Sequence, residues 1–87
     1  MKYWVKTLSV DKILKNKIVQ LDMKLNSGNF ATFIREISLE IDEPTPIVVD
    51  SQYRNFCEFN VVRFKASDYV ESVPFDKMTI EIVSEDK

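Results

Sequence analysis

The clearest alternation of apolar and polar residues lies between Val19 and Leu25, where every second side chain is apolar. Side chains of a strand point alternately to its two faces, so this pattern predicts a strand with one buried face. If that strand folds back on the N-terminal segment through a turn at residues 15–16, Leu8 lies opposite Met23. We therefore expect an N-terminal hairpin whose two apolar faces coincide.

The same region also allows a helical interpretation, in which Asp11 caps a helix over residues 12–26 and Gly28 follows its end. Leucine and isoleucine residues recur at helical spacing within it. Such a helix would leave Val19 and Met23 outside its apolar face, so we prefer the hairpin and keep the helix as the alternative.

A stripe of apolar side chains predicts the main helix of the chain. Asn29 is placed to cap its first turn, and the sequence Pro44-Thr45-Pro46 prevents it from continuing. The stripe has the spacing of one helical face, which we expect to pack against the sheet. Its members are Phe30, Phe33, Ile34, Ile37 and Ile41.

Two further elements are expected in the C-terminal half. Asp50 or Ser51 can cap a second, shorter helix with Cys57 on its inner side. Residues 61–73 keep no single period and are not assigned to a regular element, although Ala66-Ser67-Asp68 can cap a helical turn near Tyr69 and Val70. Residues 75–83 alternate again and predict the last strand.

The order strand, strand, helix, short helix, strand predicts an α+β fold. It suits a three-stranded antiparallel sheet with spatial order 2-1-3, covered by helices on one face and bare on the other. With 87 residues, we expect a single domain, 1–87, with one core and a frayed polar tail from about residue 84.

The composition excludes several classes of chemistry. The chain has no histidine and one cysteine, Cys57, so it contains no Ser-His-Asp arrangement, no cysteine zinc cluster and no internal disulfide. The lone Gly28 excludes a glycine-rich phosphate loop. The longest apolar run, at residues 47–49, is far shorter than a membrane span. We expect a cytoplasmic protein with no membrane segment, no catalytic residue, no metal and no cofactor.

The distribution of charge raises the possibility of nucleic-acid binding. Residues 1–24 carry six lysines and two aspartates, whereas residues 25–87 carry six basic and twelve acidic side chains. The N-terminal lysines alternate with Tyr3 and Trp4, a combination that can hold a single strand. Lysines also protect exposed sheet edges from pairing, and the protein is acidic overall, so this function is the least favoured.

The three arginines suggest a different function, that of a small anionic-ligand-binding or catalytic domain. Arg35, Arg54 and Arg63 would form an anion pocket if the fold brought them together, because a guanidinium binds carboxylate and phosphate through paired hydrogen bonds. The competing interpretation is that each forms a surface ion pair, as Arg63 would with Asp68.

Short strings in the second part of the chain carry a resemblance to known proteins. They are Pro44-Thr45-Pro46, Arg63-Phe64, the run 68–73 and Phe75-Asp76. Through them residues 30–83 resemble a family of small, uncharacterised bacterial cytoplasmic proteins. The resemblance implies a compartment and a fold type, and no activity.

The hypothesis we favour is a non-enzymatic module that self-associates as a homodimer or binds a protein partner. In the expected hairpin register Tyr3, Val5 and Ile18 point away from the core, where their apolar area is available for an interface. The bare sheet face or an edge strand would make the contact.

Overall fold

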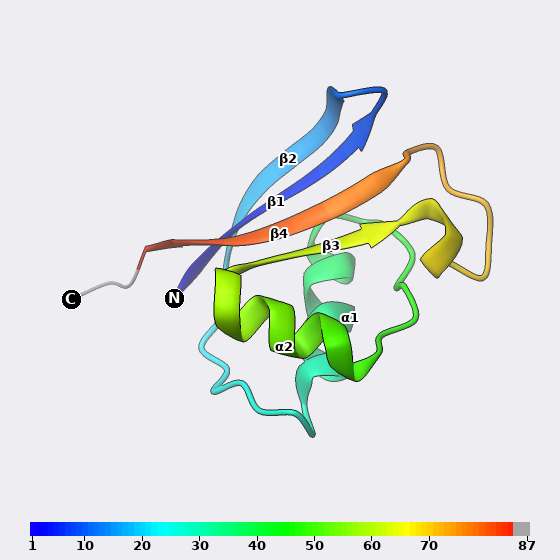
Figure 1. Ribbon diagram of the computed structural model, residues 1–87. Coiled ribbons are helices and arrows are strands. Elements are labelled where there is room, and N and C mark those ends of the chain that lie inside the picture. The colour runs from blue at the N-terminus through cyan, green and yellow to red at the C-terminus, as the bar shows by residue number, and fades with distance from the viewer. Residues whose placement is uncertain (85–87) are drawn as a thin grey trace.

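The computed structural model describes residues 1–84 and shows an α+β fold with an antiparallel sheet and two α-helices (Figure 1). The expected tail beyond residue 84 lies outside the described residues. The elements, in chain order, are β1 (Lys2–Ser9), β2 (Lys12–Gln20), α1 (Phe30–Glu40), α2 (Asp50–Phe59), β3 (Val61–Lys65), the 3-10 turn η1 (Ala66–Asp68) and β4 (Lys77–Ser84).

The fold class is as predicted, but the predicted number of strands is wrong. The sheet has four strands in the order β2-β1-β4-β3, and all neighbours are antiparallel. The predicted order 2-1-3 differs from the observed one, and the expected strand over residues 19–25 is replaced by β2, in which Ile13 lies opposite Leu8. The additional strand, β3, lies within the segment to which no regular element was assigned, and it pairs along the free side of β4.

The N-terminal hairpin forms, but its turn lies at Val10 and Asp11 and not at residues 15–16. Both turn residues have positive φ angles, 49° and 63°, which suits the twist of a two-residue hairpin loop but is unusual for valine. The amide of Val10 donates to the Asp76 carboxylate at 2.7 Å. This contact with a distant loop helps to hold the turn where the local sequence does not favour it.

The earlier turn reverses the expected facing of the first strand. Tyr3 and Val5, which we expected to point outward, are 2% and 0% exposed and belong to the core. The prediction of a strand over residues 19–25 is wrong, because Leu21 and Met23 lie beyond the end of β2. They belong to a segment without regular secondary structure and pack half-buried against that core. The helical alternative over residues 12–26 is also wrong, because β2 occupies most of that range.

Helix α1 supplies the centre of the core, as its stripe predicts. Phe33, Ile34 and Ile37 are fully buried, and the ring of Phe33 lies edge-on to that of Tyr3 at 4.9 Å between centroids. Each such side chain contributes about 1.5–3 kcal/mol of burial energy. Helix α2 adds Phe56 to the same cluster, but Cys57, expected on its inner side, is exposed.

Candidate functional site

Both helices lie on one side of the sheet, so its strands present an inner face to the helices and an outer face away from them (Figure 1). Burial alternates accordingly along β1 and β3, whereas Met78, Thr79 and Ile80 of β4 are all buried. The pairing register arranges the outer face in three rows from β2 across to β3: Ile18, Trp4, Glu81, Val61; then Asn16, Lys6, Thr79, Arg63; then Ile13, Leu8, Lys77, Lys65.

The outer face is basic. Among these twelve residues, one is acidic, Glu81, and four are basic: Lys6, Arg63, Lys65 and Lys77. The region that contains both helices, residues 30–59, carries six acidic and two basic side chains. The two sides of the molecule therefore differ in charge, and their fields attract partners of opposite sign.

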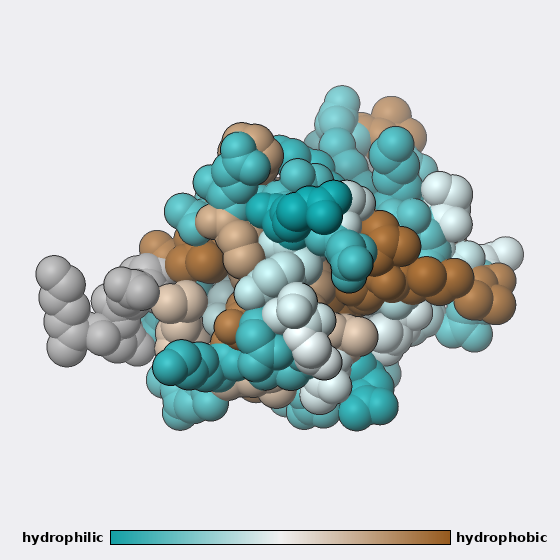
Figure 2. All heavy atoms as spheres, turned by 60° about the horizontal axis from the view of Figure 1, so that its bottom comes forward, coloured by the Kyte–Doolittle hydropathy of each residue, from teal (hydrophilic) through white to brown (hydrophobic). Residues whose placement is uncertain are grey.

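The helix side is more mixed in polarity. Figure 2, which brings this side forward, shows mostly teal and pale side chains with groups of brown apolar ones between them. Exposed apolar residues of the helices and the loop that joins them include Leu39, Ile47, Val49 and Phe59. Single exposed apolar residues are ordinary on protein surfaces, and they carry no specific chemistry here.

A groove of about 210 Å³ crosses the basic part of the outer face. Lys6, Arg63 and Lys77 lie around Thr79, and Glu81 borders the groove as its acidic residue. Lys6 on β1 and Arg63 on β3 are the direct cross-strand neighbours of Thr79, and Lys77 precedes it by two residues on the same face. Three strands thus bring three cations to one place.

Thr79 is 7% exposed, and within residues 1–84 its hydroxyl has no hydrogen-bond partner. Lys77 forms one contact across the face, 3.9 Å from the Asp11 carboxylate, with the two side chains 40% and 94% exposed. An ion pair this long and this exposed contributes little, so it does not withdraw Lys77 from the groove.

An aromatic side chain lies beside the groove. The ammonium of Lys6 lies 4.0 Å from the centroid of the Trp4 ring, a cation–π contact that occupies one face of the indole. On the other side of Trp4, Ile18 is 51% exposed on the edge strand β2. The outer face therefore combines cations with apolar area.

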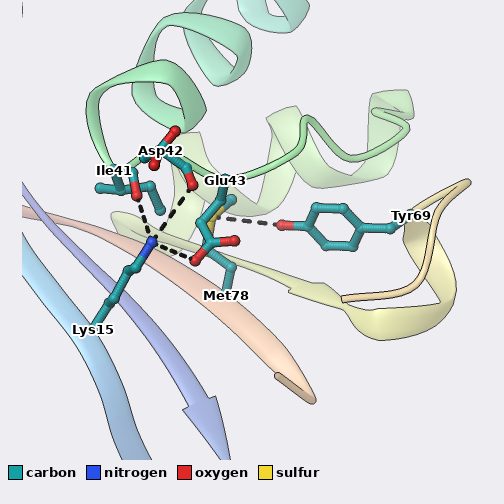
Figure 3. A network of polar contacts seen from close by, with 6 residues as sticks. All are labelled: Lys15, Ile41, Asp42, Glu43, Tyr69 and Met78. Atoms are coloured by element: carbon teal, nitrogen blue, oxygen red, sulfur yellow. Dashed lines mark hydrogen bonds and ion pairs between the residues drawn. The ribbon is translucent and has the colours of Figure 1, made fainter. Parts of the chain in front are cut away.

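Two other lysines of the hairpin, Lys15 and Lys17, have a structural role. The Lys15 ammonium donates to the carbonyl of Ile41 at 3.0 Å and pairs with the Glu43 carboxylate at 2.8 Å (Figure 3). Lys17 donates to the carbonyl of Glu40 at 3.1 Å. Both cations thus bind the C-terminal end of α1, where the helix dipole favours positive charge. They hold β2 to the helix and do not contribute to the outer face.

Tyr69 closes the core near the same end of the sheet. Its hydroxyl donates to the Met78 sulfur at 3.5 Å (Figure 3). Burial raises the pKa of Tyr69 well above its usual value of 10.0, and the nearby carboxylates of Glu43 and Asp68 raise it further. Tyr69 is therefore neutral at physiological pH, and we assign it to packing.

The exposed thiol of Cys57 lies at an apolar hollow of about 370 Å³ between α2 and the N-terminal strand. The pKa of Tyr53, one turn away on α2, is raised mainly by a hydrogen bond to Cys57 and further by burial. Neither group has an activating cation beside it in the described contacts, so we assign no reaction to them.

The predicted anion-binding arginines do not meet at this groove. Arg35 and Arg54 are exposed on α1 and α2, which cover the inner face, whereas Arg63 borders the groove on the outer face. The expected partner of Arg63, Asp68, instead accepts the backbone N–H of Lys65 at 2.9 Å. Of the three, Arg63 alone contributes to the candidate site.

The predicted interface residues are also divided. Tyr3 and Val5 are core residues, as described above, and Ile18 lies on the outer face. The sequence did not predict that Lys6, Lys77 and Thr79 lie together. One signal was available for β3: Val62 and Phe64 alternate with Arg63 and Lys65, which is the pattern of a strand with one basic face.

Within residues 1–84, no three cysteine, histidine, aspartate or glutamate side chains are grouped so as to hold a metal ion. Across the same range, no helix has the length and apolar character to cross a membrane. Comparisons with models of protein families, with curated proteins and with solved structures found no match to this chain, so its function is argued from its own geometry.

Proposed function

We propose that this protein is a non-enzymatic cytoplasmic binding module that docks an acidic segment of a protein partner on the outer face of its sheet. The observation that carries the proposal is the charge of that face, four basic side chains against one acidic, in a protein with a net charge of −2. A partner of negative charge is attracted to this face and repelled by the acidic helix side.

Apolar side chains on the same face favour a polypeptide partner. Trp4, Leu8 and Ile18 lie among the cations, and Trp and Arg are the residue types most enriched at the centres of protein interfaces. The apolar groups provide area to bury, while the cations select the sign of the partner's charge. An acidic segment with interspersed apolar residues matches both features.

A single-stranded nucleic acid fits this face less well. Proteins that hold single strands without sequence preference stack successive bases on several aromatic rings. The outer face offers Trp4 alone, with Lys6 against one side of its ring and the Glu81 carboxylate as its neighbour on β4.

A second copy of the chain also fits less well. Two outer faces brought together in a symmetric dimer place like charges opposite one another, which costs free energy in an interface. Pairing through the edge strand β2 would bring Lys12 of each copy to the junction, and a lysine on an edge opposes such pairing. We therefore favour a different protein as the partner.

A matched pair of charge reversals tests the proposal. The variant Lys6→Glu/Arg63→Glu changes the outer face, and the control Arg35→Glu/Arg54→Glu changes the net charge equally on the helices. The probe is a fluorescent peptide that alternates acidic residues with leucine, followed by anisotropy from about 50 to about 200 mM salt. We expect the outer-face variant to lose at least about tenfold in affinity and the control to lose less than about twofold.

Two further probes sharpen the result. A peptide with glutamine and asparagine in place of its acidic residues should not bind measurably, because the cations then gain nothing from it. A single-stranded oligonucleotide should bind more weakly than the acidic peptide. Equal losses in the two variants, or tighter binding of the oligonucleotide, would contradict the proposal.

A further inference from the structure

The hydroxyl of Thr79 is a buried polar group without a partner in the described chain, and the residue lines the groove of the outer face. A buried hydroxyl that makes no hydrogen bond is costly, and native proteins leave few such groups. Its flanking neighbours Lys6 and Arg63 are long side chains that extend to the surface. A ligand that enters between them would give the hydroxyl an acceptor.

The groups that surround Thr79 are suited to an oxyanion. Arg63 offers a planar fork of N–H donors, Lys6 and Lys77 each offer an ammonium, and Thr79 adds an O–H donor. A ligand with three acceptor oxygens can engage donors that arrive from three strands, whereas both oxygens of a carboxylate can be engaged by a single guanidinium. The number of donors therefore favours a phosphate group.

The balance of charge leads to the same choice. Lys6, Arg63 and Lys77 carry three positive charges, and Glu81 on the rim carries one negative charge. The groove therefore has an excess of two positive charges, which is close to the charge of about −1.5 to −2 on a phosphate monoester at neutral pH. A single carboxylate would neutralise half of it.

The groove has room for such a group. Its volume of about 210 Å³ is several times the share of about 30 Å³ that one water molecule takes in the liquid. We infer that the groove over Thr79 binds a phosphate monoester carried by a side chain of the acidic partner. This inference rests on the proposed function, since it names the group that the partner places in the same site.

The test compares one acidic peptide with phosphoserine, glutamate or serine at its central position. Binding to the full chain is followed by anisotropy. We expect the phosphoserine peptide to bind at least about tenfold more tightly than the glutamate peptide, and both more tightly than the serine peptide. Thr79→Val should reduce affinity for the phosphoserine peptide about fivefold and leave affinity for the glutamate peptide unchanged, because it removes one donor to the phosphate.

The sheet provides its own control. Thr7 is also buried, and its hydroxyl also has no partner within the described residues, but it lies on the inner face. Thr7→Val makes the same chemical change away from the groove, so it should leave the phosphoserine preference unchanged. An equal loss in both variants would show a general effect of the substitution and would contradict the inference.

The remaining outcomes separate the inference from the proposed function. If all three peptides bind equally and the outer-face charge reversal still abolishes binding, the phosphate site is wrong and the acidic-partner function stands. If none of the peptides binds, both are wrong. Inorganic phosphate should compete only weakly, and competition as strong as that of the phosphoserine peptide would contradict a phosphate carried by the partner.

Discussion

The inner and outer faces of the sheet arise from one alternation of side chains, yet they differ in almost every chemical property. On the inner face Val5, Phe64 and Ile80 are fully buried beneath the helices. On the outer face their immediate neighbours in sequence include Lys6, Arg63 and Glu81. Because the helices bury the inner face, that face supplies the stability of the sheet, and the outer face is free to carry charge for recognition.

The two buried threonines show the same contrast at the level of single atoms. Thr7 and Thr79 each have a hydroxyl with no hydrogen-bond partner among the described residues. Thr7 points toward the core, where no polar ligand can reach it, whereas Thr79 lies between two cations at a groove. One orphan hydroxyl is a packing defect, and we interpret the other as part of a site.

The largest expected effect is a difference between the two faces in how much a truncated side chain lowers the free energy of unfolding. Phe33→Ala removes a fully buried ring opposite the inner face and should lower the free energy of unfolding by about 3–5 kcal/mol. Trp4→Ala removes a larger ring from the outer face but should cost less, about 2 kcal/mol, because Trp4 is partly exposed and its removal leaves no closed cavity. Urea unfolding measures both. Similar costs would mean that the outer face is part of the core.

A second test uses pH to probe the inner side at Tyr69. Its pKa in the folded protein is raised above the usual 10.0, so the unfolded chain loses the proton first. The stability that Tyr69 contributes is therefore complete below about pH 10 and is lost above it, by up to about 1.4 kcal/mol per pH unit. Tyr69→Phe should flatten this decline in urea unfolding at rising pH, and an unchanged decline would show that Tyr69 is not buried as described.

The smallest expected effect concerns the threonine pair. Thr7→Val and Thr79→Val each replace a buried, unpaired hydroxyl with a methyl group of similar size, so each should raise the free energy of unfolding by up to about 1 kcal/mol. Added phosphate should raise the midpoint of thermal unfolding of the Thr7→Val protein more than that of the Thr79→Val protein. The same response to phosphate in both would remove the distinction between the two hydroxyls.

The sequence was sufficient to predict α1, because its stripe from Phe30 to Ile41 has a helical period and a proline-rich stop after it. Asn29 occupies the expected cap position, although its side chain binds the loop before the helix and makes no cap hydrogen bond. The last strand was predicted for a similar reason, since alternation in residues 77–82 is clear. Periodicity was not a reliable guide everywhere, because the alternating residues 21–25 lie outside any strand.

The hairpin turn was mispredicted because a distant contact outweighs local preference. Residues 15–16 offer a lysine and an asparagine, which is an ordinary turn, whereas Val10 is a poor residue for a positive φ. Two contacts of Asp76 fix the real turn. Its carboxylate accepts the amide of Val10, and its own amide donates to the Leu8 carbonyl at 2.7 Å. Nothing in the N-terminal sequence alone indicates this contact.

The candidate site was only partly predictable for a related reason. Arg63 was identified by its chemistry, but its partners Lys6 and Lys77 join it through the register of β1, β4 and β3. A shift of one residue in a strand moves every side chain to the opposite face, so an error in the hairpin register assigns charges to the wrong surface. The misplacement of Tyr3 and Val5 is the same error.

The most direct test of the account maps the binding surface by amide chemical shifts. The acidic phosphoserine peptide is titrated into the isotope-labelled protein, and the affected backbone amides are identified. We predict that the largest shifts fall on Lys6, Arg63, Lys77 and Thr79 and their neighbours on β1, β3 and β4. Shifts confined to α1 and α2, with the outer face unchanged, would contradict the proposal that the uncovered sheet is the binding surface.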